Sequence, residues 1–317
     1  MNTPPARPAV AIANPLDDAR RFGHEAMACE WEIFVVGETP DYAAQAAGVA
    51  FEEIDRVERD LSRFRTDSDV TRLNSLPPGE SLRIGPIAFD CLELAAAVSA
   101  ATAGAFDVTI GGLLRSAGGV RKEVTPLEQR SSPPAPVAAV HGMRFLHLDR
   151  AARTVRKDID GLVIDLGAIG KGYGVDLAAE TLREWRIRAA LIHSGQSSLF
   201  AIGSPDGAAA WMVEIRDPQS GGALGRVALR NASVSGSGIR IHGRHIVDPR
   251  HGTATAGRAG AWAIAGSAAL SDAVSTAAMV LADDELEAFS ARFPDIALLT
   301  IDESGAKRTL GPWQWVD

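Results

Sequence analysis

The sequence predicts an α+β fold. At 317 residues the chain exceeds what one hydrophobic core usually serves, so we expect two closely packed lobes or one large domain. Short apolar runs rich in β-branched residues predict strands, and longer runs with apolar residues three and four positions apart predict helices. The chain contains segments of both kinds, from Glu30–Val36 to the apolar stretch 259–282, and the fold class is therefore mixed.

The composition restricts the partners of the protein. A net charge of -8 and a pI near 5.4, without any basic run, argue against nucleic acid or an anionic membrane surface as the main partner. Any anion site must therefore be local. The two cysteines, Cys29 and Cys91, form no CxxC pair and no disulfide framework, so we interpret them as small buried residues.

The N-terminal segment lacks hydrophobic periodicity. We expect residues 1–23 to form a disordered or loosely packed arm and residues 24–317 to form a single domain. The segment has no basic start followed by a sustained apolar region, which a signal peptide requires, so we expect a cytoplasmic protein without membrane insertion.

The regular elements follow from periodicity. Between the first two helices, the segment SRFRTDSDVTRLN contains turn and cap residues at Asp67–Asp69, and Phe64 in it is more typical of a core residue than of a ligand platform. Asp107 lies in an apolar run and needs a partner. A Pro-rich excursion is expected at about 115–142. The predicted elements are a strand at Glu30–Val36, helices at Asp41–Leu61 and Ile87–Thr102, strands within Ala189–Gly203, and a hairpin of Ala210–Ile215 with Gly225–Leu229.

The stretch Val163–Asp176, VIDLGAIGKGYGVD, is the strongest local signal. Leu162–Leu166 is short and apolar and predicts a buried strand that carries Asp165 near its carboxyl end. Three glycines and Lys171 follow, and helical spacing begins at Tyr173. A glycine loop at a helix N-terminus favours anions. The spacing fits neither a dinucleotide-binding fingerprint nor a P-loop, and an ordinary α/β corner is the alternative.

Histidines gather in the later part of the chain. His193 lies in a predicted strand and is more typical of a hydrogen-bonded core residue than of a catalyst. His242, His245 and His251 lie in a segment rich in Ser, Gly and Arg, where phosphate binding and proton transfer are expected. Zinc ligation by these three is an alternative, although no cysteine accompanies them.

The stretch 259–282 contains one charged side chain, Asp272. The spacing from Leu270 to Leu281 is helical, and Asp272 and Thr276 lie together opposite the apolar stripe. A buried carboxylate needs a cation or several donors. Because both side chains offer oxygen, they predict a hard-metal site, with Mg²⁺ before Zn²⁺. A transmembrane helix fits poorly, because alanine dominates and the acid is central.

Six motifs lie in order over roughly Met27 to Leu299. They are SRFRTDSDVTRLN, GAFDVT, DLGAIGKGYGVD, SVSG, HIVDPRHG and SDAVST. With these motifs the chain resembles the FAD:protein FMN transferases, the ApbE-type flavinyltransferases, whose fold is T-fold-like with the site between two lobes. The family's patterns, in the same order, include G-x-F-D-x-T, D-L-G-G-I-A-K-G-Y-x-V-D, H-I-x-D-P-x-T-G and A-D-A-x-x-T.

The resemblance implies an activity and a set of site residues. Members bind FAD and Mg²⁺, transfer FMN through a phosphoester bond to a Ser or Thr of an acceptor protein, and release AMP. His245 is the implied catalytic residue, near the pyrophosphate. The implied FAD contacts are Met27, Phe64 (stacking on adenine), Ala105, Phe106, Asp107, Asp165, Lys171 and His245, and the implied metal ligands are the Ala168 carbonyl, Asp272 and Thr276.

The chain also departs from the family pattern. Ser194, Gly195 and Gln196 replace a G-G-D/N turn, and His251 replaces the Thr of P-x-T-G. Two alternative functions remain open: an Mg²⁺-dependent FAD pyrophosphatase, with water as the acceptor, and a flavin-binding protein without turnover. The intact His245, Asp272 and Thr276 argue against the second.

Overall fold

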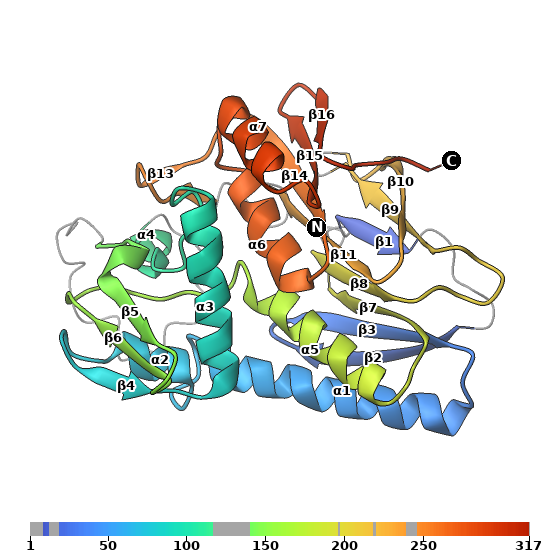
Figure 1. Cartoon of the computed structure of the whole chain (residues 1–317), viewed down its shortest axis with the longest axis horizontal. Coiled ribbons are helices and arrows are strands. Elements are labelled where there is room, and N and C mark those ends of the chain that lie inside the picture. The colour runs from blue at the N-terminus through green and yellow to red at the C-terminus, as the bar shows by residue number, and fades with distance from the viewer. Residues whose placement is uncertain are drawn as a thin grey trace, which may run out of the picture.

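The structure is a computed structural model that describes residues 9–12, 19–116, 140–195, 197–217, 220–238 and 246–316. In these residues, eight antiparallel strands form the central sheet (Figure 1). At both ends of the sheet, strands that follow one another in the sequence pair with each other. The strands, in spatial order, are β16 (Lys307–Leu310), β15 (Ala297–Asp302), β14 (Arg258–Ala265), β11 (Ala232–Gly238), β8 (Ser198–Ile202), β7 (Ala189–Ser194), β3 (Cys29–Val36) and β2 (Arg20–Ala26).

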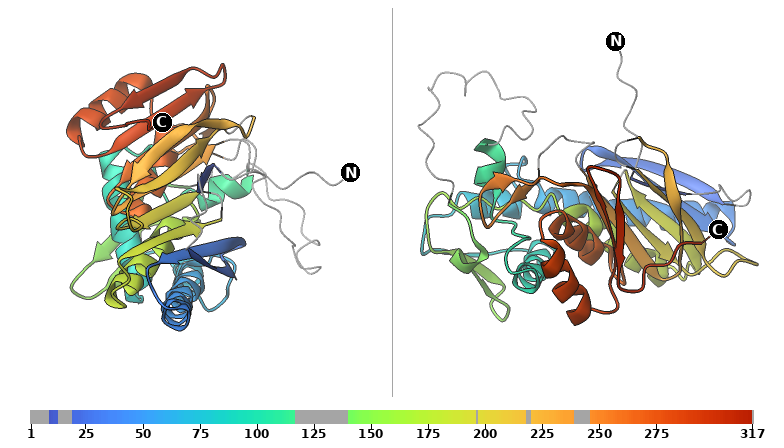
Figure 2. Two further views of the ribbon diagram at one scale, coloured as in Figure 1. Left: turned by 90° about the vertical axis from the view of Figure 1, so that its right-hand side faces the viewer. Right: turned by 90° about the horizontal axis from the view of Figure 1, so that it is seen from above.

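Each face of this sheet is covered, which makes a layered molecule (Figure 2). Alternation along β3 sends Trp31, Ile33 and Val35 toward α1 (Pro40–Leu61) and α5 (Gly170–Glu184). Val36 points to the opposite face, where a second, three-stranded sheet packs. That sheet consists of β1 (Val10–Ile12), β9 (Trp211–Arg216) and β10 (Ala223–Leu229). The predicted strands at 30–36 and 189–203, the hairpin and the helix ending at Leu61 are confirmed.

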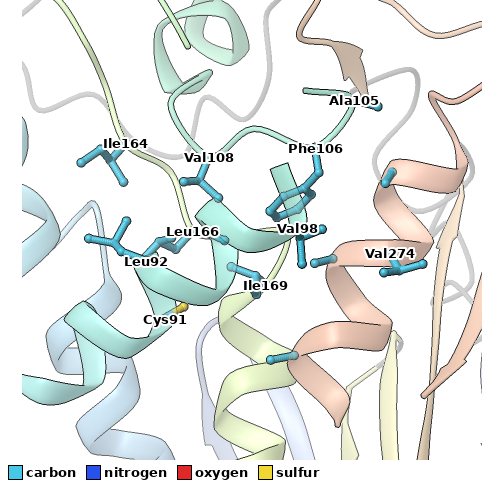
Figure 3. Close-up of a cluster of buried hydrophobic side chains, with 14 of the residues drawn as sticks. Cys91, Leu92, Val98, Ala105, Phe106, Val108, Ile164, Leu166, Ile169 and Val274 are labelled. Carbon is cyan, nitrogen blue, oxygen red and sulfur yellow. The ribbon is translucent and has the colours of Figure 1, made fainter. Parts of the chain in front are cut away.

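A smaller lobe packs beside the sheet, on the left of Figure 1. Its core joins α3 to α6 through residues such as Leu92, Val98 and Val274, with Ile164 and Ile169 between the two lobes (Figure 3). The apolar stretch 259–282 thus divides into β14 and a short buried helix, α6. The elements outside the two sheets already described are α2 (Asp69–Asn74), β4 (Ser81–Arg83), α3 (Pro86–Ala101), α4 (Gly111–Ser116), η2 (Met143–Phe145), β5 (Leu146–Asp149), β6 (Thr154–Lys157), β12 (Val247–Asp248), β13 (Thr253–Ala254), α6 (Ala268–Ala278) and α7 (Asp283–Arg292).

The expectation of a loose N-terminal arm over residues 1–23 is wrong where the structure describes that segment. Val10–Ile12 pairs with β9, Val10 is fully buried, and β2 begins at Arg20. A three-residue strand is too short to show periodicity, and its burial depends on pairing with a strand two hundred residues away. Residues 1–8 and 13–18 lie outside the described part.

Leu162–Leu166 is not a sheet strand, contrary to prediction. It runs extended and makes one parallel bridge, Ile110 to Val163. The backbone of Ile164 is paired by a side chain instead, because the Asn74 amide donates to Ile164 O (3.0 Å) and accepts from Ile164 N (2.7 Å). The two hydrogen bonds from Asn74 take the place of a neighbouring strand beside Ile164, and the next residue, Asp165, begins the glycine loop.

Most of the predicted Pro-rich excursion at 115–142, namely residues 117–139, lies outside the described part. Among the helices that the structure describes, none has both the length and the apolar character needed to cross a membrane.

Candidate metal and nucleotide site

Helices α5 and α6 begin side by side and pair each other's first turns. The Gly172 N–H of α5 donates to Asp272 Oδ2 of α6 (3.1 Å). In return, Asp176 of α5 accepts from Ala268 N (2.6 Å) and Ala269 N (2.8 Å) at the start of α6. Each helix thus satisfies donors that the other leaves unpaired. The positive ends of the two helix dipoles consequently meet at one place.

Glycine is required for this close contact. A Cβ atom on Gly172 would lie 2.3 Å from the Ala268 carbonyl oxygen, a distance that no side chain tolerates. The glycine loop therefore has a packing function as well as an open backbone. Asp176 is a site residue whose role the sequence analysis missed, although it ends the central motif, because its partners are backbone groups of a distant helix.

Asp272 is buried, with 4% of its surface exposed. Burial raises the pKa of its carboxyl, and the charge of Lys171 and the Gly172 N–H act in the opposite direction. The Ser198 hydroxyl also favours the ionised form, although it is buried without a partner in good hydrogen-bond geometry. Desolvation is the largest of these effects, and the pKa of the Asp272 carboxyl is therefore raised. The prediction that both sides of this helix are covered by protein is confirmed.

Asp272 and Thr276 are neighbours on the surface of α6, because they lie four residues apart. Thr276 follows one turn later, and its hydroxyl donates to Asp272 O (3.2 Å) and contacts Ser237 Oγ (3.1 Å). In a regular helix the Gly172 N–H would donate to the Ala168 carbonyl, four residues earlier, but here it donates to Asp272. Among the described residues, no hydrogen bond to the Ala168 carbonyl is found. Within the described residues no group of three or more His, Cys, Asp or Glu can hold a metal ion. The metal ligands expected from the sequence, namely the Asp272 carboxylate, the Thr276 hydroxyl and the Ala168 carbonyl, stay a prediction.

A seam of hydroxyl groups joins α6 to β11. Ser271 contacts both Ser233 (2.8 Å) and Ser235 (2.7 Å), and Ser237 contacts Ser275 (2.9 Å). Strand alternation places every second residue of SVSGS on the face toward α6. The seam is buried and hydrogen-bonded, and it fixes α6 on the sheet.

The glycine loop is held by Asp165. Its Oδ1 accepts from Gly167 N (2.9 Å), and its Oδ2 pairs with Arg63 Nη1 (3.2 Å). Lys171 Nζ donates to Gly167 O (3.3 Å). Burial raises the pKa of both Asp272 and the partly buried Cys29, and the charge of Lys171 acts against that rise in each case. Arg63 is a second residue that the sequence analysis did not assign.

Phe64 is exposed at 70%, so its interpretation as a core residue is wrong. The loop that carries it is nevertheless ordered. Ser62 Oγ accepts from Phe64 N (3.2 Å), and Ser68 caps α2 by accepting from Thr71 N (2.9 Å). An ordered loop that presents a bare aromatic ring is suited to stacking against a planar ligand.

Met27 lies at the tip of the hairpin between β2 and β3. Met27 (φ 50°) and Ala28 (φ 59°) both adopt left-handed backbone conformations, as a two-residue hairpin turn requires. A non-glycine pair there carries strain, which is typical of functional loops. The Met27 side chain reaches the glycine loop, because its Cε lies 3.5 Å from a Cβ position built on Gly170.

The side chains of the GAFDVT motif face inward. Ala105 and Phe106 are 2% exposed and belong to the large hydrophobic core cluster (Figure 3), so neither presents its side chain at the surface. Asp107 accepts from Thr109 N (2.7 Å), Thr109 Oγ1 (2.6 Å) and Met143 N (3.1 Å). These bonds explain the acid in an apolar run, and they engage its carboxylate with the protein itself.

The catalytic candidate His245 lies outside the described residues, as do His242 and Gln196. Of the HIVDPRHG segment, the structure describes Asp248, which accepts from Arg250 N (2.8 Å) and contacts His251 Nδ1 (2.9 Å). His193 is buried and its Nδ1 lies 3.5 Å from Glu32 Oε2, whereas its Nε2 has no hydrogen-bond partner among the described residues. The zinc alternative for the three later histidines therefore stays untested.

Two surface hollows lie elsewhere. One, of about 560 Å³, is lined by α3 residues with Arg150 and Arg153, and the other, of about 550 Å³, lies between Arg258 and Lys307. Neither includes Phe64, Lys171 or Asp272 in its lining. We therefore locate the site by the chemistry of its residues rather than by the depth of the surface.

Fold and local geometry together define a class: an α+β protein in which a glycine loop and two converging helix N-termini lie beside a buried aspartate. The chain belongs to the ApbE family, whose family model matches residues 27–300. The family resemblance and the α+β fold class are thereby confirmed.

Curated relatives support the same placement. The chain is 28% identical over 241 residues to an FAD:protein FMN transferase of Rhodobacter capsulatus, which covers 73% of this chain and 46% of that protein. It is 25% identical over 258 residues to an FAD:protein FMN transferase of Klebsiella pneumoniae strain 342, covering 77% and 73%. The chain thus spans about half the length of the first of these relatives and nearly three quarters of the second.

Solved structures share the fold. The ApbE protein of Thermotoga maritima superimposes with a TM-score of 0.79 at 24% identity, covering 93% of this chain and 97% of that one. The flavinyl transferase ApbE of Pseudomonas stutzeri, in its apo form, gives a TM-score of 0.77 at 25% identity, covering 92% and 94%.

Proposed function

We propose that this protein is an Mg²⁺-dependent FAD:protein FMN transferase. The oxygen of an acceptor Ser or Thr forms a bond to the FMN phosphorus, the pyrophosphate bond breaks, and AMP leaves while the hydroxyl proton is taken up. The activity of the named relatives supports this reaction. The single observation that carries the proposal is Asp272, a buried carboxylate beside two helix N-termini and without a side-chain cation in hydrogen-bonding contact among the described residues.

The residues present fit a magnesium ion. Asp272, Thr276 and the Ala168 carbonyl would hold it, since all three are hard oxygen donors and that carbonyl accepts no hydrogen bond in the described part. When bound, Mg²⁺ supplies positive charge that offsets the charge of the pyrophosphate. It would also remove the need for Asp272 to be neutral in its buried position.

The remaining residues bind and orient the nucleotide. Lys171 supplies a positive charge for phosphate oxygens, and the positive end of the α5 dipole adds to it. Phe64 offers an exposed ring to the adenine, and Met27 borders the glycine loop. Ala105, Phe106 and Asp107 are FAD contacts that the family resemblance implies, and all three are buried here. We assign the proton transfer to His245, whose imidazole titrates near neutral pH in its ordinary state.

An intact-mass assay tests the proposal. Purified protein is incubated with FAD, Mg²⁺ and an acceptor carrying an exposed Ser/Thr flavinylation motif, and the acceptor should gain one FMN. An acceptor whose hydroxyl residue is replaced by alanine is the matched control and should gain nothing. His245→Gly should bind FAD in a titration yet leave the acceptor unmodified.

The alternatives give different products. Free FMN and AMP in solution, with no modified acceptor among those tested, identify a pyrophosphatase. FAD binding without either product identifies a binding protein, and His245 then has no catalytic role. Transfer that persists in excess EDTA removes the magnesium from the proposal.

A further inference from the structure

The Arg63 guanidinium makes two contacts that join distant parts of the site. Its Cζ lies 4.7 Å from the centroid of the Phe64 ring, over the ring face. Its Nη1 lies 3.2 Å from Asp165 Oδ2, and the two side chains are only 15% and 10% exposed. Asp165 in turn holds Gly167 N at 2.9 Å. A continuous path therefore runs from the exposed ring to the glycine loop.

We propose that Arg63 is a positioning residue for the nucleotide, which sets the Phe64 ring and the Asp165 carboxylate relative to each other and neutralises that carboxylate. The inference rests on the proposed function, because it concerns how the same site recognises a purine nucleotide carrying phosphate. It gives a role to a residue that is neither a predicted FAD contact nor a predicted metal ligand.

The contact with the ring fixes a side chain that otherwise has few neighbours. Phe64 is exposed at 70%, so without a packing partner its ring would sample several rotamers. A planar guanidinium stacks well on an aromatic face and is weakly hydrated. The Arg63 guanidinium covers one face of the Phe64 ring and leaves the opposite face for a planar base. Because the ring is already held in one orientation, binding the base does not require it to lose further rotamer entropy.

The contact with Asp165 controls charge. A nearly buried carboxylate that loses its partner leaves an uncompensated negative charge. That charge would lie at the mouth of a loop proposed to receive phosphate, and it would repel the ligand. Arg63 thus acts on the phosphate through Asp165 as well as on the base through Phe64.

Arg65 is a built-in control. It lies two residues away, carries the same charge and pairs with Asp67 (3.2 Å), but the Arg65 and Asp67 side chains are 49% and 60% exposed. Within the described residues, the Arg65 side chain forms no ion pair with Asp165 and does not stack on the Phe64 ring. A substitution at Arg65 therefore changes the net charge of the loop equally without touching the path from the ring to the glycine loop.

The experiment compares Arg63→Gln, Arg63→Lys and Arg65→Gln. Dissociation constants are measured for FAD, ADP and adenosine, and melting temperatures without ligand identify any variant that is misfolded. We expect Arg63→Gln to weaken FAD about tenfold or more, and to weaken ADP more than adenosine, since one unscreened charge several ångströms away acts on phosphate alone. Arg63→Lys should restore the ADP-to-adenosine ratio, because it keeps the charge, while losing part of the planar stacking.

The outcomes separate this inference from the proposed function. Binding of FAD by the wild-type protein tests the function itself. If the wild type binds FAD and Arg63→Gln binds it equally well, or Arg65→Gln loses as much affinity, Arg63 is not a positioning residue. An equal loss for ADP and adenosine overturns the charge role. If Arg63→Gln is unfolded, the ratio measured for Arg63→Lys decides, and an altered ratio in that folded variant counts against the inference.

Discussion

Replacing Asp272 by asparagine is the most direct test of the metal site. The amide has nearly the volume of the carboxylate, and its oxygen can still accept the Gly172 N–H. The change removes a charge from a position that is 4% exposed, where burial raises the carboxyl pKa because it disfavours the ionised form. In EDTA the variant should therefore melt at the wild-type temperature or above it.

Magnesium should reverse that order. An ion that binds only the folded state stabilises it by about 2.7 kcal/mol at one hundred times its dissociation constant. For a chain of this size that corresponds to a rise of roughly 5 °C in melting temperature. We expect the wild type to show this rise and Asp272→Asn to show none, and transfer activity to be lost in the variant.

The assay is a thermal melt in EDTA and in a magnesium titration, with Asp284→Asn as the matched control. Asp284 is an exposed acid on α7 and should keep the full magnesium response. Two results would refute the reasoning. One is an undiminished magnesium response in Asp272→Asn. The other is a drop of several degrees for that variant in EDTA, which would mean that the charge is stabilised by the protein alone.

Three further predictions concern binding, packing and pH. Phe64→Ala should weaken FAD binding by about 1–3 kcal/mol in a titration while Phe64→Tyr keeps it, and unchanged affinity in the alanine variant removes the ring from the site. Gly172→Ala should unfold the protein or separate α5 from α6, whereas Gly48→Ala, in open space on α1, should stabilise it by about 0.5–1 kcal/mol; equal melting temperatures would contradict the packing argument. The hydrogen bond from His193 and the charge of Arg21 hold the pKa of Glu32 below its usual value of 4.5. Glu32 therefore adds stability above that pH and loses it as the pH falls through the folded-state pKa, so the melting difference between wild type and Glu32→Gln should shrink on acidification, and a constant difference would argue against the linkage.

Local patterns in the sequence predict part of this molecule well. The helix at Asp41–Leu61 differs from the observed α1 by one residue, because one continuous apolar stripe packs against α5 and the sheet. Asp272 stands out because no other charge lies near it in the sequence, and its burial follows from that isolation. In both cases the physical cause lies within one segment.

Other features depend on partners that are distant in the sequence. The pairing of Ile164 by the Asn74 side chain and the ion pair between Arg63 and Asp165 join residues far apart in the chain, and neither leaves a periodic signal. Asp107 was predicted to need a partner, but its donors, Thr109 and Met143, could not be identified from spacing. Phe64 misleads sequence analysis because apolar residues are usually buried unless a ligand covers them.

The reciprocal pairing of α5 with α6 limits how the protein can change. Gly172 gives an N–H to Asp272, while Asp176 receives N–H groups from Ala268 and Ala269. Gly172 has no space for a side chain, and an apolar residue at 176 or 272 would leave backbone N–H groups of the opposite helix unpaired. We therefore expect positions 172, 176 and 272 to be inherited together, so that divergence would take place in the loops around the two helices and not at this contact.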